Sequence, residues 1–526
     1  MIKTSYGLSA CAFMGSKPMV RISLFWLYIL MHEQLLKIVT KLGSPRVMVV
    51  GDFMLDIYTY GDALRISPEA PVPVLRVRVD NTHCSCGGAG SVAADLASLG
   101  AIPVCVGIMG RDRNGQILKD KLEEIKAETS GLLQIENRPT TSKQRLVGLA
   151  QHRHQQQLFR IDEESTDPLS TEQEKEIIRL FKERLSLVDI ICLQDHNKGL
   201  LSKALCRELI TSANKAGKRI IIDPCLTSDY SKYEGATAIT PNRQESSNAV
   251  GFKLENETDF ANAANKLVEM LKLEAVVITL DKSGAYLKTN GIRQVMSTRP
   301  RDVYDVTGAG DMVLSTIVMT LAAGFDYKTA VELANITGGI EVGKFGNKTI
   351  TIDEIIDEII SQNQTDSSKV RSVDLLIDEL NWHRKRNKKI VFTNGCFDVL
   401  HTGHIEYLKF CKLQGNVVVI GLNSDSSVKK IKGADRPVNN QHDRAAVLAA
   451  LQMVDFITIF DEPDPLNLIQ RVRPDVLVKG RDWEEKGVIG REFVESYGGK
   501  VVLAPIVEGK SSTATIEKMK SLQEGS

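Results

Sequence analysis

Two series of short apolar segments, each alternating with amphipathic segments of helix length, run through this chain of 526 residues. Short apolar segments predict strands, and strands that alternate with helices predict a mainly parallel sheet covered by helices on both faces. A helix-rich stretch at residues 311–344 follows the first series. The pattern therefore predicts an α/β chain with two sheets. The expected strands are at residues 46–51, 190–193, 219–222 and 275–279 in the first series, and at 389–392, 417–420, 456–460, 476–478 and 501–504 in the second.

A polar stretch marks the expected division between two domains. The sequence Ser-Gln-Asn-Gln-Thr-Asp-Ser-Ser begins at residue 361 and has no periodic hydrophobic residues, so we expect a linker at residues 361–375. It would join a larger α/β domain at 35–360 to a smaller one at 376–526. Two domains agree with the length of the chain, which exceeds what one hydrophobic core usually serves.

Residues 1–34 are expected to lie outside both domains. Lys17 and Arg21 precede an apolar run at 22–31, which is too short to span a bilayer and is similar to the apolar part of a signal peptide. No clear cleavage site of small residues follows it. We therefore expect a disordered extension, or a misassigned start with Met31 as the natural beginning. This predicts a cytoplasmic protein without a membrane partner.

The charge balance and the cysteines narrow the classes of partner. Lysine and arginine together equal aspartate and glutamate, at 66 each, so no net positive field favours nucleic acid, and we expect no such partner. Anionic substrates must be bound by local groups. The nine cysteines are scattered, and Cys84 and Cys86 lack the second ligand pair of a structural zinc site. We interpret all nine as reduced thiols and expect no structural metal.

The sequence Asp-Val-Thr-Gly-Ala-Gly-Asp at residues 305–311 precedes an apolar helix. Its glycines lie where the chain turns into a helix N-terminus, and the free backbone N–H groups there attract phosphate. The positive end of the helix offsets charge on a transferring group. A carboxylate at Asp311 is placed to accept the proton of a substrate hydroxyl as a general base. Because a lone G-x-G-D segment also occurs as an Asp-capped helix after a turn, the surrounding sequence must decide.

Three segments together resemble the ribokinase-like (PfkB) carbohydrate kinases, namely residues 87–100, 242–245 and 305–311. The resemblance covers residues 46–346 and implies a ribokinase-like α/β domain. It implies that Asp311 activates the sugar hydroxyl, and that the anion hole for the transferred phosphate is formed by Gly308, Ala309 and Gly310. The N-x-x-E element of the family helps to order magnesium and the ATP phosphates, and it falls on Asn242, Arg243, Gln244 and Glu245.

The part of this resemblance that concerns the sugar is less complete. The family usually has Asn where this chain has Ser91 and commonly Ala where it has Gly90. A hydroxyl still forms hydrogen bonds but reaches less far than an amide. A proline-containing segment at 66–74 is either a lid over the sugar phosphate or an edge strand or loop without a substrate role. The residues assigned to the sugar are Asp52, Asp56, Gly87, Gly88 and Ser91.

A second motif, His-Thr-Gly-His at residues 401–404, follows an apolar strand and opens a helix. Its imidazoles, His401 and His404, are three residues apart and therefore lie on one side of the first helical turn. There they can donate hydrogen bonds to the oxygens of a triphosphate as pyrophosphate leaves. Gly403 lets the backbone come close. Alone, the motif is also compatible with a capped helix that carries two surface histidines.

The motif is embedded in Gly-Cys-Phe-Asp at 395–398, and Ser-Ser-Thr-Ala-Thr-Ile follows at 511–516. This set resembles the cytidylyltransferase-like nucleotidyltransferases, which implies a Rossmann-like α/β domain in which both histidines stabilise the transition state. Asn423 and Asp425 are expected at the nucleotide end of a parallel strand. Candidates for phosphate contacts are Lys432, Arg436 and Lys479, although each alone is compatible with a surface position. The nucleotide-binding residues are then Gly395, Phe397, Asp398, Asn423, Asp425, Lys432, Arg436, Lys479, Ser511, Ser512 and Thr513.

Finer motifs in both halves resemble bacterial bifunctional enzymes that combine a heptose 7-phosphate kinase with a heptose 1-phosphate adenylyltransferase. They lie at residues 51–56, 66–74, 195–199, 423–438 and 478–482, with His196 and Asn197 where the family more often has Tyr-Gly. The resemblance implies Mg²⁺ with ATP, heptose phosphates as substrates, ADP-heptose for lipopolysaccharide as product, and a homodimer paired through lid segments. Two alternatives remain: the same reactions on another phosphosugar or nucleotide, or a sugar-phosphate sensor in which Ser91 marks an inactive kinase.

Overall fold

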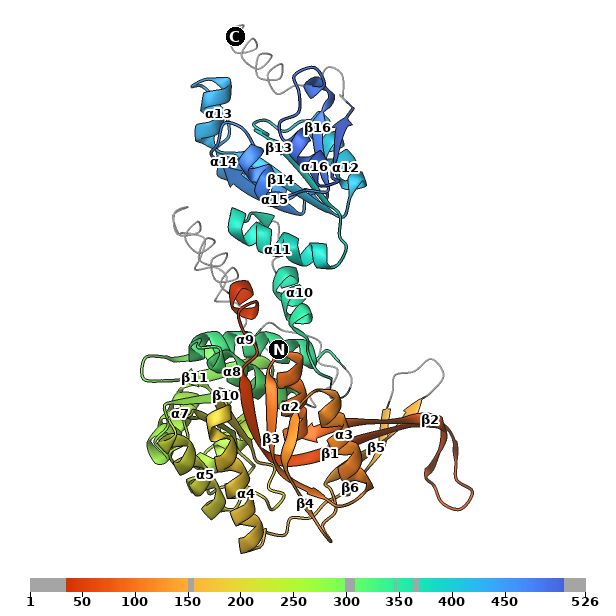
Figure 1. The fold of residues 1–526 in the computed structure, drawn as a ribbon, viewed down its shortest axis with the longest axis vertical. Helices are drawn as coiled ribbons and strands as arrows, with labels where there is room; N and C mark the ends of the chain where they lie inside the picture. Colours follow the sequence, from red (N-terminus) through yellow and green to blue (C-terminus); the bar gives the residue numbers. More distant parts are fainter. Residues whose placement is uncertain are drawn as a thin grey trace, which may run out of the picture. The chain divides into compact units, whose positions relative to one another are not determined.

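The computed structural model describes residues 35–149, 156–298, 308–344, 346, 348–362 and 369–505. The chain divides into two compact units, residues 35–359 and residues from Ile360 onward (Figure 1). Four expectations lie wholly or partly outside the described residues: the extension at 1–34, residues 305–307 of the glycine-rich motif, the middle of the linker, and Ser511, Ser512 and Thr513. None of the described helices is long and apolar enough to span a membrane.

The first unit is built on a long, mainly parallel sheet. Its strands follow the order β12-β11-β10-β9-β8-β7-β1-β3-β4, and only β11 and β12 run antiparallel to their neighbours. All four described expected strands of the first series are present, which confirms an α/β unit. The strands of this sheet are β1 (Arg46–Ile66), β3 (Ile102–Gly110), β4 (Glu128–Ile135), β7 (Ile190–Gln194), β8 (Ile220–Asp223), β9 (Ala238–Ile239), β10 (Ala275–Thr279), β11 (Ala285–Lys288) and β12 (Arg293–Met296).

Helices cover both faces of this sheet (Figure 1). One face packs its alternate apolar residues against α4 (Thr171–Arg184), α5 (Lys203–Lys215) and α7 (Glu257–Leu271). On the other side α2 (Ala89–Ser98) contacts β1 and α8 (Ala309–Ala322), and α8 packs on α9 (Tyr327–Glu341). The remaining helices are α3 (Arg113–Glu124), α6 (Arg243–Val250) and α10 (Ile352–Gln362).

Strand β1 is much longer than the six residues expected from the sequence, because it changes partners halfway. Its first part, from Arg46 to Asp52, pairs with β3 and β7 in the main sheet. From Phe53 onward it pairs with β2 (Pro73–Gly88) and with β5 (Ser142–Leu149), which in turn pairs with β6 (Gln156–Glu163). These strands form a small second sheet that projects from the unit (Figure 1), and we call it the lid sheet. The segment at 66–74 is the tip of its β1–β2 hairpin.

The second unit is a five-stranded parallel sheet in the order β15-β14-β13-β16-β17. This order reverses direction beside β13, as in doubly wound folds that bind nucleotides. Apolar residues of α11, α15 and α16 pack on one face, and those of α12 and α14 on the other. The elements are α11 (Val373–Lys385), β13 (Ile390–Gly395), α12 (Thr402–Gln414), β14 (Val417–Asn423), α13 (Asp425–Lys432), α14 (Gln441–Ala449), β15 (Phe456–Phe460), α15 (Leu466–Val472), β16 (Val476–Gly480), α16 (Arg491–Ser496) and β17 (Lys500–Ala504).

The segment expected as a linker carries helix at both ends. Helix α10 continues to Gln362, and α11 begins at Val373 with Ser372 as its N-cap. The Ser372 hydroxyl accepts a hydrogen bond from the Leu375 N–H group. Serine is common both in linkers and at helix N-caps, so a polar residue that suggests a linker here marks the start of a helix. The apolar residues Leu375 and Leu376 are buried.

Candidate active sites

The candidate site of the first unit lies at the carboxyl ends of the central parallel strands, the edge where α/β sheets bind ligands. Asp52 ends the main-sheet part of β1, Gln194 ends β7 and Asp223 ends β8. Helix α8 brings Asp311 to this edge in its first turn. The structure thus assembles residues that are more than 250 positions apart in the sequence.

Helix α8 begins in the way that the glycine-rich motif predicts. Gly308 is its N-cap with a φ of 90°, a conformation that favours glycine, and no side chain caps this end of the helix. A side chain at Gly310 would meet nothing within 4 Å, so there is open space beside the first turn. Backbone N–H groups at such an end attract anions. This uncapped helix start is compatible with an anion hole, and the assignment of Gly308, Ala309 and Gly310 to it stays a prediction.

Asp311 is held by a hydrogen bond and has an unusual pKa. The Gln194 Nε2 group donates to its Oδ1 atom at 2.7 Å. Burial raises the pKa of Asp311 to about 7, and the negative charge of Asp56 adds to this rise. The Gln194 hydrogen bond, the positive charge of Lys143 and the Ser91 hydroxyl oppose it. A carboxylate with a pKa near neutrality suits a general base that works at neutral pH.

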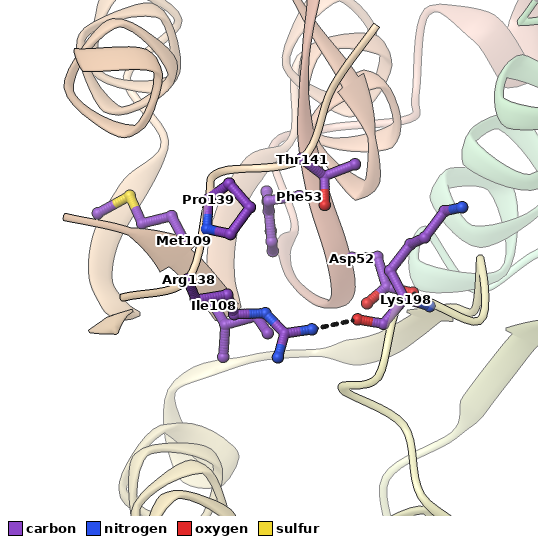
Figure 2. Close-up of a pocket in the computed structure, with 8 residues that line it drawn as sticks. All are labelled: Asp52, Phe53, Ile108, Met109, Arg138, Pro139, Thr141 and Lys198. Carbon is purple, nitrogen blue, oxygen red and sulfur yellow. Dashed lines mark hydrogen bonds between the residues drawn. The ribbon is translucent and has the colours of Figure 1, made fainter. Parts of the chain in front are cut away.

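Asp52 lies in a pocket at the end of β1 (Figure 2). Its Oδ2 atom accepts the backbone N–H groups of His196 at 3.0 Å and Lys198 at 3.2 Å. Its Oδ1 atom has no partner among the described residues. Burial and the charge of Asp195 raise the pKa of Asp52 to about 6. The pocket is lined by Asp52, Phe53, Ile108, Met109, Arg138, Pro139, Thr141 and Lys198.

Asp56 continues the site into the lid sheet. Its Oδ1 atom accepts a hydrogen bond from Arg145 Nη1 at 2.6 Å, and both side chains are almost fully buried. Gly87 is required beside it, because a Cβ atom there would come within 2.8 Å of Asp56 Oδ2. A Cβ atom at Gly88 would come within 2.5 Å of the Asp52 carbonyl oxygen. The two predicted glycines therefore let β2 lie close against the acidic side of β1.

Ser91 lies at the start of α2, beside the base. Its hydroxyl donates to the Cys86 carbonyl oxygen at 3.2 Å, is almost fully buried, and helps to lower the pKa of Asp311. The structure therefore brings the position that departs from the family pattern next to Asp311.

The N-x-x-E element forms a capping box at the start of α6. Asn242 Oδ1 accepts the Glu245 N–H group at 2.9 Å, and Glu245 Oε2 accepts the Asn242 N–H group at 2.7 Å. Arg243 packs on the Phe260 ring and donates to the Leu254 carbonyl oxygen, while Gln244 is exposed. These contacts give the element a local structural role, and its contact with nucleotide stays a prediction.

Sequence reasoning missed several residues of this site: Gln194, Asp223, Lys143 and Arg145. Burial raises the pKa of Asp223 well above its ordinary value, and Glu245 and Asp311 raise it further. Lys143 and Arg145 come from β5 of the lid sheet, where they alternate with Gln144. Basic residues two positions apart on a strand share one face, and this is the signal that could have found them.

The candidate site of the second unit also lies at the carboxyl ends of parallel strands. Gly395 ends β13, Asn423 ends β14 and Lys479 lies near the end of β16. Helix α12 begins beside them at Thr402, with His401 as its N-cap and no side-chain cap of its own. Asn423 ends β14 and Asp425 begins α13, so both lie at the carboxyl end of a parallel strand, and their contact with nucleotide stays a prediction.

The two histidines of the motif lie together. The ring centroids of His401 and His404 are 3.9 Å apart, and the Phe397 ring lies 5.2 Å from His404. Burial lowers the pKa of His404 to about 4, and its interactions with His401 and Lys432 lower it further. His404 is therefore neutral at physiological pH and can donate only one ring N–H group. Phe397 has a φ of 44°, which turns its ring back over Gly395.

Asp398 and Arg436 form an ion pair at the site, with Arg436 Nε at 2.5 Å from Asp398 Oδ2. The other carboxylate oxygen accepts the backbone N–H groups of Val438 at 2.7 Å and Asn439 at 3.3 Å. Asp398 therefore fixes the loop that precedes α14. Direct contacts of Asp398 and Arg436 with nucleotide stay predictions.

Arg444 organises this site and was not found from the sequence. It is almost fully buried on α14, where its Nη1 atom donates to the carbonyl oxygens of Cys396 at 2.6 Å and Asn423 at 2.8 Å. Its Nη2 atom donates to Asp425 Oδ1 at 2.7 Å. Arg444 thus ties the ends of β13 and β14 together. No local sequence signal distinguishes it from a surface arginine of an amphipathic helix.

The two predicted lysines differ in their surroundings. Lys479 donates to Asn394 Oδ1 at 2.5 Å and lies over the Trp483 ring, so it is held in place on the sheet. Lys432 is exposed at the end of α13, close enough to His404 to lower the pKa of that imidazole.

Comparisons with known proteins agree with these two units. Residues 44–354 match the model of the pfkB family carbohydrate kinases, and residues 392–514 match the cytidylyltransferase-like model. The tetrameric inhibited form of phosphofructokinase-2 from Escherichia coli is 19% identical, with a TM-score of 0.50, and covers 60% of this chain and 99% of its own. Fold and sites together define an enzyme that joins a carbohydrate kinase to a nucleotidyltransferase, as the motifs predicted.

Relatives of the same length identify the family. The bifunctional protein HldE of Geobacter sulfurreducens is 40% identical over 91% of this chain and 96% of its own length. The bifunctional protein HldE of Aliarcobacter butzleri is 40% identical over 90% of this chain and 98% of its own. This chain belongs to the family of bifunctional HldE proteins, which confirms the family indicated by its motifs.

Proposed function

We propose that the two units carry out two separate steps in the synthesis of ADP-heptose. The first unit transfers the γ-phosphoryl group of ATP to the C1 hydroxyl of D-glycero-β-D-manno-heptose 7-phosphate, giving the 1,7-bisphosphate and ADP. A separate phosphatase must then remove the 7-phosphate. The second unit transfers AMP from ATP to D-glycero-β-D-manno-heptose 1-phosphate, giving ADP-heptose and pyrophosphate. Membership of the bifunctional HldE family is the observation that carries this proposal.

In the kinase step Asp311 takes the proton of the C1 hydroxyl as its oxygen attacks the γ-phosphorus. Its raised pKa and its place in the first turn of α8 support this role. The N–H groups of Gly308, Ala309 and Gly310 stabilise the negative charge of the transferring phosphoryl group. Only interactions that are stronger in the transition state accelerate the reaction, and these N–H groups have no side-chain partner to give up.

The sugar is held between the main sheet and the lid sheet. Asp52 supports this because its buried Oδ1 atom has no partner among the described residues, and a buried carboxylate oxygen of this kind needs a hydrogen-bond donor. Asp56 and Ser91 lie close enough to Asp311 to change its pKa, and Lys143 offers a positive charge from the lid sheet. These groups match a ligand that combines several hydroxyls with a phosphate.

Mg²⁺ accompanies ATP in both reactions. The residues present fit it in the kinase unit, because Asn242 and Glu245 supply oxygen ligands of the kind that Mg²⁺ prefers. Burial raises the pKa of Glu245, and the charge of Glu245 also raises the pKa of Asp223, so negative charge accumulates there that a cation would offset. Mg²⁺ would neutralise the charge of the phosphates as they react. Asn242 and Glu245 would hold it, together with the phosphates of ATP.

In the adenylyl step an oxygen of the sugar 1-phosphate attacks the α-phosphorus of ATP, and the bond to pyrophosphate breaks. His401 and His404 donate hydrogen bonds to the phosphate oxygens that gain charge. The 3.9 Å separation of their rings supports joint action on one group. Lys432, Lys479 and the end of α12 add positive potential at the same edge.

We further propose that the enzyme acts in the cytoplasm as a homodimer paired through its lid sheets. The lid sheet exposes large apolar side chains on three strands, including Leu64 at 69%, Ile66 at 63% and Phe159 at 63%. Large apolar side chains exposed on one small sheet favour a protein interface there. Light scattering of the full chain tests this: a mass of two chains supports it, and a mass of one chain contradicts it.

Phosphorus NMR of the purified protein tests both reactions. The protein is mixed with MgATP and, in separate tubes, with heptose 7-phosphate or heptose 1-phosphate. ADP and a sugar bisphosphate are expected in the first tube, and pyrophosphate with a sugar diphosphate in the second. Replacing ATP by CTP in the second tube checks the base. If no product signal appeared in either tube, the heptose assignment would be rejected. If heptose 7-phosphate bound in the first tube but no ADP formed, the kinase would be inactive.

A further inference from the structure

We propose that Gln194 positions the catalytic base of the kinase: its side-chain amide holds one carboxylate oxygen of Asp311 and so orients the other to accept the proton of the sugar hydroxyl. The inference rests on the assignment of Asp311 as the base. It adds a residue that the glycine-rich motifs do not contain.

The contacts of Gln194 fix the orientation of its amide. Its Nε2 group donates to Asp311 Oδ1 at 2.7 Å and lies 3.3 Å from Asp223 Oδ2. An amide nitrogen carries two hydrogens, so one is available for each carboxylate. The Oε1 atom has no partner among the described residues. The opposite orientation of the amide would place Oε1 against two carboxylates and would be repulsive.

The backbone around Gln194 is closely packed, so the position of its Cα atom in the sheet is fixed. The residue is 1% exposed at the end of β7, where it pairs with Gly51 of β1 and Asp223 of β8. A Cβ atom at Gly51 would come within 2.3 Å of the Gln194 carbonyl oxygen, so β1 approaches β7 as closely as glycine allows. Thr240 Oγ1 donates to Asp223 Oδ1 at 3.0 Å. Both neighbours of the amide are therefore held in place.

Several neighbouring groups raise or lower the pKa of Asp311, and Gln194 is one of those that lower it. Burial raises its pKa, and among the groups that lower it the Gln194 hydrogen bond has the largest effect. A hydrogen bond donated to the charged form of a carboxylate favours that form. Gln194 therefore keeps the base ionised in a site that would otherwise protonate it. Among the described residues, the other groups that interact with Asp311 are Asp56 of β1, Lys143 of β5, Cys192 of β7, Ser91 and Asp95 of α2, and Asp223 of β8.

The test is the pH dependence of kcat/KM for the kinase reaction in Gln194→Met, which keeps the size of the side chain and removes its N–H donors. This parameter reports the pKa of the free enzyme. We expect the rising limb to move up by about one pH unit, with about a fivefold loss at pH 7, about a tenfold loss at pH 6 and recovery towards pH 9, since a hydrogen bond to a charged group has effects of this order. Gln194→Asn, whose amide is too short to reach Asp311, should shift the limb in the same direction.

A matched control removes a buried polar contact elsewhere in the same unit. In Thr337→Val the hydroxyl contact with Thr316, at 2.8 Å in the core behind α8, is lost, so stability falls while the limb stays at the wild-type pH. Thermal unfolding of each variant checks that the first unit is folded, since adenylyl transfer reports only on the second unit.

Two results would overturn the role of Gln194: a limb at the wild-type pH in both Gln194 variants, or a loss that is equal at every pH. Kinase activity in Asp311→Asn would instead reject the base itself. The failure of the inference and the failure of the assigned base are therefore distinguishable.

Discussion

The two candidate sites use the same physical effect in opposite directions. Burial raises the pKa of Asp311 in the first unit to about 7 and lowers the pKa of His404 in the second to about 4. In both cases burial disfavours the charged form. The carboxylate thereby becomes basic enough to take a proton near neutral pH, whereas the imidazole stays neutral and keeps a single N–H group.

The difference follows from what each reaction needs. A sugar hydroxyl must lose its proton to attack a phosphoryl group, so the first site requires a group that changes its protonation state. A sugar phosphate is already ionised when it attacks, so the second site requires only donors to the charge that develops. One chain therefore contains a site whose rate should follow the titration of its central residue, and another whose rate should not.

The largest difference between the two sites is expected in Asp311→Asn. The amide cannot accept the hydroxyl proton, so the kinase rate should fall by about 10²- to 10⁴-fold, while adenylyl transfer keeps its wild-type rate. Coupled assays for ADP and for pyrophosphate on one preparation measure both. If adenylyl transfer fell with the kinase rate, the two sites would not be separate.

His404→Ala is the reciprocal change in the second unit. Loss of one donor to the transition-state charge is expected to slow adenylyl transfer by about 10²- to 10³-fold, with the kinase rate unchanged. Pyrophosphate release is the measurement. An adenylyl rate within a few fold of wild type would show that His404 is only a partner of the Phe397 ring.

A smaller effect concerns stability and uses a second buried carboxylate of the kinase unit. Burial, Glu341 and Asp311 raise the pKa of Asp95 well above its ordinary value, which favours its protonated form in the fold, whereas it is ionised after unfolding at neutral pH. Its contribution to the free energy of unfolding therefore falls as the pH rises above about 4. Asp95→Asn has no such group. Its melting temperature relative to wild type should increase between pH 5 and pH 8, by about 2–4 °C per kcal/mol.

Thermal unfolding of both proteins at several pH values measures this. Asp120→Asn, on the exposed side of α3, is the matched control and should show a difference that does not change with pH. A constant difference for Asp95→Asn as well would mean that Asp95 is ionised in the fold.

The sequence predicted local elements better than it predicted long-range ones. The strand at 456–460 has the bounds expected from its apolar residues, because burial on both faces makes a continuous apolar run. Strand β1 was expected to end near Gly51 and continues to Ile66. Its second half carries polar residues such as Asp56, and only pairing with β2 and β5 shows that it is a strand.

The same distinction holds for the sites. Asp311, His401 and His404 belong to compact motifs, so the residues next to them in the sequence indicate their role. Gln194 and Arg444 act through partners 117 and 19 to 48 positions away, and no local pattern sets them apart. The N-x-x-E element shows the converse case, because the spacing that indicates a phosphate site also forms a capping box.

The most direct test is the pH dependence of kcat/KM for both reactions, measured on one preparation of the full chain. The substrate phosphates titrate near pH 6 in both reactions, so that limb is shared. We predict that the kinase rate alone continues to rise through a second limb near pH 7 and that adenylyl transfer is flat there. A limb near pH 7 in both reactions, or in neither, would contradict the assignment of a titrating base to the first site and a neutral donor to the second.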